Sequence, residues 1–176
     1  GLEDLRRAIG AEFGKAVALL LECRGKPVVC GVGKSGIVAR KIAATLSSTG
    51  TPAVYLHPGD AVHGDMGMIT KDDVFLAVSK SGQNDELSKL LPHVKRMGVR
   101  TVAITAKADS PLARESEIVL LTRAEKEACP MNLAPTASTT AALAMGDALA
   151  IALLERRGFT EEDFAIFHPA GDLGRR

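Results

Sequence analysis

Aromatic residues are scarce in this sequence. Phe, Tyr and Trp together make up 3% of its 176 residues, and Trp is absent. Proteins that bind single-stranded nucleic acid stack the bases on aromatic side chains, so this composition disfavours that class. The sequence also lacks an excess of one charge: it has 22 Lys and Arg and 21 Asp and Glu, which gives a net charge of +1. No field of one sign would attract nucleic acid or an anionic membrane, and we expect neither as a partner.

Cysteines and long apolar runs are scarce as well. Cys23, Cys30 and Cys129 are an odd number without C-x-x-C spacing, which argues against a disulfide framework and a structural zinc site. No uninterrupted apolar run reaches the ~18 residues of a membrane span. The first ten residues are charged and do not have the pattern of a signal peptide. We therefore expect a soluble, cytoplasmic protein.

The patterns that are present predict an α/β fold. Short β-rich apolar runs alternate with stretches of helical spacing, as in βαβ units. This alternation predicts a single doubly wound domain with a five-stranded parallel sheet flanked by helices. The predicted strands are residues 28–30, 53–56, 74–78, 101–104 and 118–121. The predicted helices are residues 2–23, 35–48, 85–97, 111–116 and 138–156, followed by an acidic segment at 160–167 and an irregular tail.

The first predicted strand runs into a glycine-rich loop. Residues 31–36 read Gly-Val-Gly-Lys-Ser-Gly, between a strand and a helix whose first N–H groups can hold a phosphate. A dinucleotide site needs an acidic residue at the end of the second strand, where residues 55–58 read Tyr-Leu-His-Pro, so NAD is disfavoured. A P-loop needs Gly at the position of Val28, so ATP is disfavoured too. Lys34 supports phosphate binding; the alternative is a glycine-rich turn without a ligand.

The third predicted strand runs into a second polar loop. Residues 79–86 read Ser-Lys-Ser-Gly-Gln-Asn-Asp-Glu and lead into a helix. Hydroxyls, turn N–H groups and the helix start together can cradle one phosphate, although a simple serine helix cap is the alternative. Two such loops on one sheet edge favour a small phosphorylated metabolite as ligand.

A third polar stretch and the histidines complete the set of candidates. Residues 125–130 and 135–140 place carboxylates before a loop and hydroxyls at a helix start, which by itself predicts a capped helix with a solvated charge cluster. His57 and His63 follow the second strand on the ligand edge, and His168 lies in the tail. His93 has no companion motif and is interpreted as structural.

Seven stretches of the sequence together resemble a known family. They are GVGKSG, SSTGTP, HPGDAVHGDMGM, SKSG, KEACPMNLAPTASTTAALAMGDALA, GFTEEDF and HPAGDLGRR. These stretches resemble the sugar isomerase (SIS) domain, and within it the bacterial arabinose 5-phosphate isomerase family. The resemblance covers nearly the whole chain, so we expect residues 1–176 to form one SIS domain. The pair of C-terminal CBS domains that many relatives carry is not present in this sequence.

The resemblance implies an aldose–ketose isomerase. Its reaction would be the reversible conversion of D-ribulose 5-phosphate to D-arabinose 5-phosphate through a cis-enediol, which leads toward Kdo in lipopolysaccharide biosynthesis. No cofactor is required for this chemistry. An isomerase of another sugar phosphate and a non-catalytic module that senses phosphosugars are the alternatives.

The resemblance also implies a set of site residues. Glu127 would move the carbon-bound proton, with Glu86 the second choice for that role; His168 would assist ring opening or protonate an oxygen, and Lys34 would stabilise the oxyanion. The catalytic set is Lys34, His63, Glu86, Glu127 and His168. The substrate-binding set is Gly33, Ser35, Gly50, Thr51, His63, Ser79, Ser81, Ser138 and Thr139. An inhibitory zinc ion is expected at His57, where one histidine makes only part of a metal site.

One loop of this sequence differs from the family's pattern, and the resemblance also implies how the chains assemble. The family's Ser-Asn-Ser-Gly-Glu loop is here Ser-Lys-Ser-Gly-Gln at residues 79–83, which places an extra cation at the phosphate edge. The resemblance implies a homo-oligomer, expected to be a tetramer, in which His63 or His168 serves a neighbouring chain. The small residues of 141–152 would suit helix packing at such an interface, and packing within one chain explains them equally well.

Overall fold

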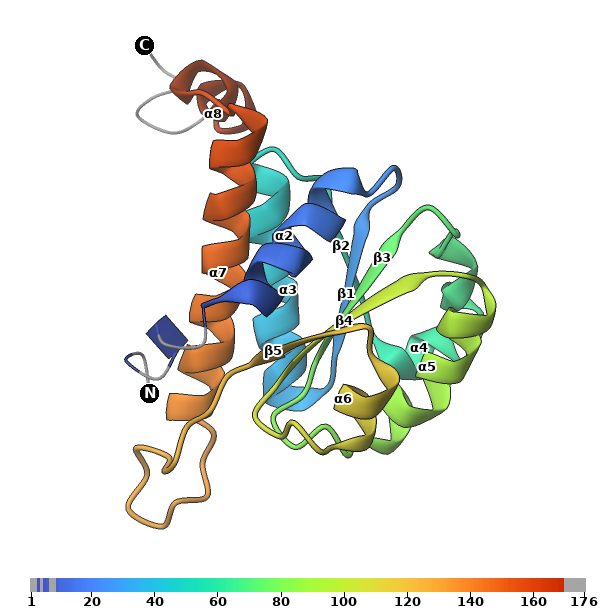
Figure 1. Ribbon diagram of the computed structural model, residues 1–176, viewed down its shortest axis with the longest axis vertical. Coiled ribbons are helices and arrows are strands. Elements are labelled where there is room, and N and C mark those ends of the chain that lie inside the picture. The colour runs from blue at the N-terminus through green and yellow to red at the C-terminus, as the bar shows by residue number, and fades with distance from the viewer. Residues whose placement is uncertain (1–2, 4, 7–8, 170–176) are drawn as a thin grey trace.

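Five parallel strands form one sheet at the centre of the computed structural model in Figure 1, which describes residues 3, 5–6 and 9–169. The strand order is β2-β1-β3-β4-β5. The strands are β1 (Pro27–Gly31), β2 (Val54–Leu56), β3 (Val74–Val78), β4 (Arg100–Thr105) and β5 (Ile118–Leu121). Every strand boundary lies within one residue of its prediction, and the doubly wound α/β fold is confirmed.

Helices cover both faces of the sheet. On one face lie α2 (Ala11–Glu22), α3 (Gly33–Ser48) and α7 (Ala137–Arg157); on the other lie α4 (Pro58–Ala61), η1 (Asp65–Met68), α5 (Asp85–Arg96) and α6 (Pro111–Glu115). The last helix, α8 (Glu161–Phe167), follows α7 at the end of the molecule away from the strands' carboxyl ends (Figure 1).

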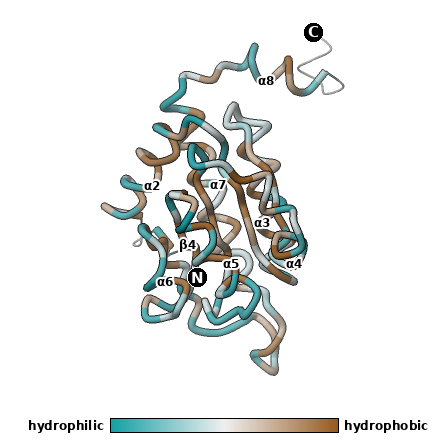
Figure 2. Tube along the Cα trace, turned by 90° about the vertical axis from the view of Figure 1, so that its right-hand side faces the viewer, coloured by the Kyte–Doolittle hydropathy of each residue, from teal (hydrophilic) through white to brown (hydrophobic). Residues whose placement is uncertain are grey.

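The two faces of the sheet bury alternate residues of each strand. In β3, Val74, Leu76 and Val78 pack with α2, α3 and α7, whereas Phe75 and Ala77 pack on the opposite side with α5. A parallel sheet covered on both faces needs such continuous apolar strands. Figure 2 shows the strands in hydrophobic colours, while the loops at the lower end of the molecule are mostly hydrophilic.

Small residues let α7 approach α3 closely. A methyl group on Gly146 would overlap the fully buried side chain of Ile42, so glycine is needed where the two helices meet. Among the described residues, α7 is the one helix long and apolar enough to cross a membrane by length and composition. Its buried residues, from Ser138 to Leu153, pack into the core against α3, as expected of a core helix.

The prediction of one helix over residues 2–23 is wrong in its middle. Ile9 and Gly10 lie outside any helix, and α2 begins at Ala11. Gly10 has φ −155° and ψ −145°, and glycine is the residue that most readily leaves helical geometry because it loses the most backbone freedom in a helix. Residues 2, 4, 7 and 8 of the predicted helix lie outside the described residues, as do residues 170–176 of the tail.

Asp73 joins the chain before β3 to the chain before β1. Its side chain is only 1% exposed. One carboxylate oxygen accepts a hydrogen bond from the Lys26 N–H at 2.8 Å; the other accepts from the Thr70 N–H at 2.8 Å and from Lys26 Nζ at 3.1 Å. Burial alone would raise the pKa of Asp73, but these hydrogen bonds outweigh burial and lower it. The carboxylate therefore stabilises the folded state while it is ionised.

We predict that Asp73→Asn lowers the free energy of unfolding by about 1–3 kcal/mol at pH 7, because hydrogen bonds to a charged group are lost. The pKa of Asp73 is lower in the folded than in the unfolded state, so its contribution is present above the unfolded value of about 3.9 and is lost as the pH falls through the folded value. Urea unfolding at pH 7 and at pH 3 measures both effects. The control is Asp72→Asn, whose residue is exposed; an equal loss in the two variants would contradict the prediction.

Candidate functional site

The carboxyl ends of β1, β3, β4 and β5 meet the beginnings of α3, α5 and α7 at the lower end of the molecule (Figure 1). Ligands of open α/β sheets bind beyond this edge, next to the point where the chain switches from one side of the first strand to the other. Here that point lies between β1 and β3, which are paired neighbours. Three cavities adjoin at this edge.

The first cavity, of about 240 Å³, lies between the starts of α3 and α7 and is called the helix cavity below. It brings together four of the predicted site residues from two distant parts of the chain. Its lining consists of Val32, Lys34, Ser35, Val38, Lys80, Ile104, Thr122, Pro135, Ser138, Thr139 and Ala142. Two lysines and several hydroxyls thus line one space.

The second cavity, of about 370 Å³, lies over the loop of residues 79–82 and is called the serine cavity. It joins the predicted phosphate residues of both loops, because Ser35 lines it together with Ser79 and Ser81. The Gly82 N–H donates to Ser79 Oγ at 3.1 Å, which closes a tight turn. Gly82 has φ +62°, and a side chain there would also overlap Ser110, so the turn requires glycine.

The start of α5 faces the same cavity. Asn84 Oδ1 accepts a hydrogen bond from the Leu87 N–H at 3.1 Å and caps the helix, and Ser81 Oγ accepts from the Gln83 N–H at 3.2 Å. The alternative prediction, that a serine of this loop only caps the helix, is therefore wrong, because Asn84 caps α5. The serine hydroxyls line the cavity and can donate hydrogen bonds to an anion.

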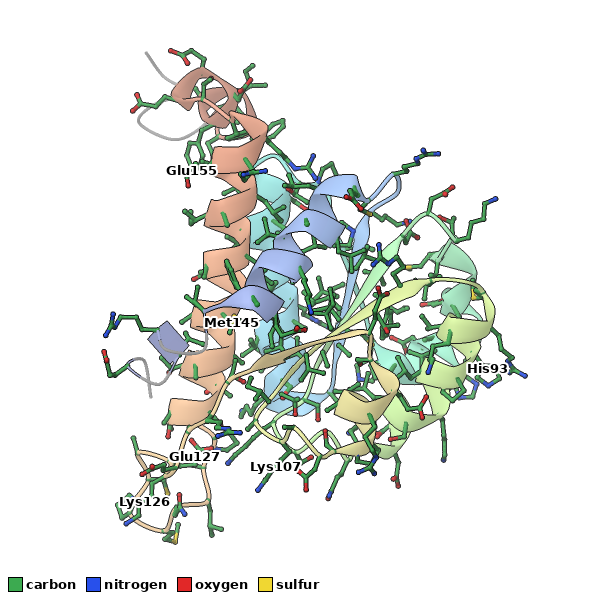
Figure 3. The ribbon with its side chains drawn as sticks, viewed as in Figure 1. His93, Lys107, Lys126, Glu127, Met145 and Glu155 are labelled. Carbon is green, nitrogen blue, oxygen red and sulfur yellow. The ribbon has the colours of Figure 1, made fainter. Side chains whose placement is uncertain are left out.

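Glu127 lies where the segment after β5 meets α7 (Figure 3), and it is buried. Its side chain is 1% exposed. One carboxylate oxygen accepts from the Thr136 N–H at 2.8 Å and the Ser138 N–H at 3.1 Å, and the other accepts from Lys80 Nζ at 2.6 Å and from the Ser138 hydroxyl. The interpretation of this stretch as a solvated charge cluster is wrong for Glu127, because its carboxylate caps the start of α7 from inside the protein.

These contacts set the charge of Glu127. Burial alone would raise the pKa of the carboxyl group, but the hydrogen bonds from Lys80, Ser138 and Thr136 outweigh it and hold the pKa well below its usual range. Glu127 is therefore ionised at neutral pH. With this pKa it is a weak base in the ligand-free protein, since the pKa of an efficient general base lies nearer the working pH.

The third cavity, at about 800 Å³ the largest of the three, is lined by Glu127 itself and is called the outer cavity. Its charged lining residues follow β3, β4 and β5. Its lining consists of Lys80, Ser81, Ala106, Lys107, Ala108, Asp109, Arg123, Ala124, Glu125, Glu127 and Asn132. The predictions from sequence included only Glu127 and Ser81 of this group.

The other predicted residues on this edge are more exposed. Glu86 lies on the first turn of α5 with an exposed side chain and does not line the three cavities. Gly33 begins α3 with φ +59°, a conformation that glycine adopts readily. His63 is exposed between α4 and η1.

His57 caps α4 at the end of β2. Its Nδ1 accepts a hydrogen bond from the Gly59 N–H at 3.1 Å and lies 4.0 Å from a carboxylate oxygen of Asp60. Within residues 3, 5–6 and 9–169, no three His, Cys, Asp or Glu side chains are close enough together to hold a metal ion. Zinc binding at His57 stays a prediction, and the ion would need ligands other than the described His, Cys, Asp and Glu side chains.

Gly50, Thr51 and His168 lie at the opposite end of α7 from the cavities. Thr51 Oγ1 accepts from Arg157 Nε at 3.0 Å near the end of α7, and a side chain on Gly50 would overlap Phe159. The His168 ring stacks on Phe164, with centroids 3.8 Å apart, and Nδ1 lies 2.8 Å from the Phe164 carbonyl oxygen.

The length of α7 separates these residues from Glu127. A 21-residue helix is about 30 Å long at 1.5 Å per residue, and Figure 3 places Glu127 and Glu155 toward its opposite ends. Within one chain Gly50, Thr51 and His168 therefore cannot contact a ligand in the three cavities. A role for them in the site requires a second chain.

Lys80 is the main site residue that sequence reasoning missed. The residue was visible as an extra cation between two serines, but its partner Glu127 lies 47 positions away. Thr136 was also missed, although its N–H and hydroxyl both face the Glu127 carboxylate. The sequence did contain a signal for Thr136, namely a hydroxyl residue just before the predicted start of α7.

Comparisons with known proteins agree with this geometry. The chain is 58% identical over 175 residues to arabinose 5-phosphate isomerase KdsD of Pseudomonas aeruginosa, and 51% identical over 175 residues to KdsD of Escherichia coli. These matches cover 99% of this chain but 54% and 53% of the two relatives, so the chain spans about half the length of the curated relatives it matches.

A solved structure and a family model match as well. The structure of c3406 from E. coli CFT073 in complex with arabinose 5-phosphate superposes with a TM-score of 0.89 at 43% identity, covering 96% of this chain and 91% of that one. The model of the SIS domain matches residues 20–152. This match spans the sheet and most of its helices, and it includes the loops at residues 31–36 and 79–86 and Glu127. The chain therefore belongs to the SIS domain family.

Proposed function

We propose that this chain is the catalytic domain of an arabinose 5-phosphate isomerase, which interconverts D-ribulose 5-phosphate and D-arabinose 5-phosphate. The observation that carries the proposal is the buried, ionised Glu127, which lines the outer cavity. Its partners Lys80 and Ser138 also line the helix cavity, together with Lys34. The curated relatives named as arabinose 5-phosphate isomerases support the same substrate. The solved relative in complex with arabinose 5-phosphate supports a phosphorylated pentose as ligand.

The serine cavity is the proposed phosphate site. Ser79 and Ser81 from one loop and Ser35 from the other offer hydroxyl donors there. The starts of α3 and α5 point free N–H groups and the positive ends of two helix dipoles toward the same edge of the sheet. A phosphate held there leaves the carbon chain of a pentose to extend toward the helix cavity and Glu127.

Glu127 is the proposed carrier of the carbon-bound proton. From ribulose 5-phosphate it removes a proton from C1; the C–H electron pair forms the C1=C2 bond of the enediol, and the C2 carbonyl oxygen takes up a proton. Glu127 then returns a proton to C2, while a proton leaves the C1 oxygen and the aldehyde forms. Lys34 stabilises the oxyanion that develops during each transfer.

Because the pKa of Glu127 is low in the ligand-free protein, its donors must loosen for it to act as a base. Glu86 is the second choice for this role, since its side chain is exposed on the first turn of α5. His168 would assist ring opening or protonate an oxygen, and His63 would belong to the same catalytic set. For His168 this requires a neighbouring chain, because α7 separates it from the cavities.

We also propose that the protein works as a homo-oligomer, with a tetramer as the expected size, in the cytoplasm. The distance of Gly50, Thr51 and His168 from the cavities supports a site shared between chains. Ile37 on α3 and Ile151 on α7 expose large apolar side chains that a partner chain would cover. The product would feed Kdo and lipopolysaccharide synthesis, and His57 would bind an inhibitory zinc ion.

The first test follows the reaction by NMR in deuterated water with D-ribulose 5-phosphate. We expect D-arabinose 5-phosphate carrying deuterium at C2, because the proton that Glu127 returns exchanges with solvent at the enediol stage. Saturable binding of the sugar phosphate without product would instead indicate a sensing module. Turnover of a different sugar phosphate only would contradict the proposed substrate.

The second test separates the two carboxylates. Glu127→Gln should lower kcat by at least about 100-fold, the usual contribution of a general base, while the protein still binds arabinose 5-phosphate. Glu86→Gln should lower kcat much less. The control is Glu125→Gln, a carboxylate two residues away from Glu127 along the chain. If Glu86→Gln is the inactive variant and Glu127→Gln is not, the two roles are exchanged.

A further inference from the structure

The backbone of Lys80 is held in place by β4. Its carbonyl oxygen accepts hydrogen bonds from the Ala106 N–H at 3.1 Å and from Thr105 Oγ1 at 3.3 Å. The tight turn at Gly82 follows directly. The side chain of Lys80 therefore starts from a fixed point on the ligand edge of the sheet.

The ammonium group of Lys80 meets the buried carboxylate of Glu127. Nζ lies 2.6 Å from Oε1, and the Lys80 side chain is 49% exposed although that of Glu127 is only 1% exposed. An isolated buried carboxylate is costly, so this one requires a cation or several donors. An ammonium group has three donors, and the Glu127 oxygen occupies one of them.

Lys80 is also the residue that the three cavities share. It lines the helix cavity with Lys34, the serine cavity with Ser79 and Ser81, and the outer cavity with Glu127. A ligand whose phosphate occupies the serine cavity and whose carbon chain reaches the helix cavity would pass the half-exposed ammonium group.

Other charged and polar groups also face Glu127. The start of α7 presents the N–H groups of Thr136 and Ser138 with the positive end of its dipole, and the Glu127 N–H itself donates to Asn132 Oδ1 at 2.7 Å. On α3, Lys34 lines the helix cavity together with Lys80 and Ser138, two residues whose side chains contact the carboxylate. The charged residues around the outer cavity are Lys107, Asp109, Arg123 and Glu125. Among the contacts of the described residues, Lys80 is the one cation within salt-bridge distance of the Glu127 carboxylate.

We propose that Lys80 bridges the anionic substrate and Glu127: its ammonium group holds the carboxylate ionised and oriented while its remaining donors bind the substrate phosphate. Lys80 is thus a positioning residue for Glu127 and a binding residue for the anion. The proposal rests on the proposed function for the role of Glu127, but the pairing and the anion binding can be tested without turnover.

The experiment compares Lys80→Met and Lys80→Arg with the wild type. Glutamate labelled with 13C at Cδ gives the titration of Glu127 by NMR, with the signal assigned through Glu127→Gln. Inorganic phosphate, titrated by calorimetry, measures anion binding. Lys89→Met is the matched control, because it removes one exposed cation from α5.

We expect Lys80→Met to move the Glu127 titration upward by about one pH unit or more, since the opposite charge is lost. It should also raise the dissociation constant of phosphate about tenfold, the loss expected for a charge-assisted hydrogen bond. Lys80→Arg should restore both properties in large part, and Lys89→Met should change neither.

Two results would overturn the bridge. An unchanged Glu127 titration in Lys80→Met would show that the donors of α7 alone hold the carboxylate, and unchanged phosphate binding would show that Lys80 does not reach the anion. Both readouts remain valid if the wild type fails to isomerise ribulose 5-phosphate, so a failure of the proposed function would be recognised separately. In an active enzyme, the acid limb of kcat/KM should move upward with the Glu127 titration in Lys80→Met and return in Lys80→Arg.

Discussion

The burial of one negative charge, on Glu127, organises the ligand edge of this protein. A carboxylate with a side chain only 1% exposed is stable because three segments supply donors to it or hold it in place: the start of α7, the loop after β3 and the segment that carries Glu127 itself. Each segment is irregular near that point and would have many conformations on its own. Because the charge must be compensated by all of them together, they adopt one arrangement, which also forms the walls of the cavities.

The order of the strands explains why the two loops proposed to bind phosphate lie side by side. The chain passes from β1 through α3 to β2 on one side, then returns to β3 on the other side of β1. The loops after β1 and β3 are therefore neighbours at the carboxyl edge, and Ser35 and Ser79 line one cavity. Their adjacency creates the cavity in which the proposed phosphate site lies.

The same architecture divides the candidate residues into two groups. Lys34, Glu127 and the hydroxyls of α7 gather around the cavities, whereas Gly50, Thr51 and His168 lie near the far end of α7, a helix about 30 Å long. The second group makes local packing contacts in this chain, with Arg157, Phe159 and Phe164. An active site that uses both groups must combine two copies of the chain, which links the proposed chemistry to the proposed assembly.

The sequence by itself determined the five strands, most of the helices and the two polar loops, because local patterns of apolar residues, glycines and hydroxyls specify them. It also indicated Glu127, Lys34 and the serines through resemblance to the SIS domain. The break in the first helix was missed, since one glycine in an apolar periodic stretch is a weak local signal. Only the tertiary structure decided that Glu127 is buried and paired with Lys80, and that His168 is distant. Those properties depend on contacts between residues far apart in the chain, such as the 47 positions from Lys80 to Glu127, and on the length of α7, neither of which a local pattern encodes.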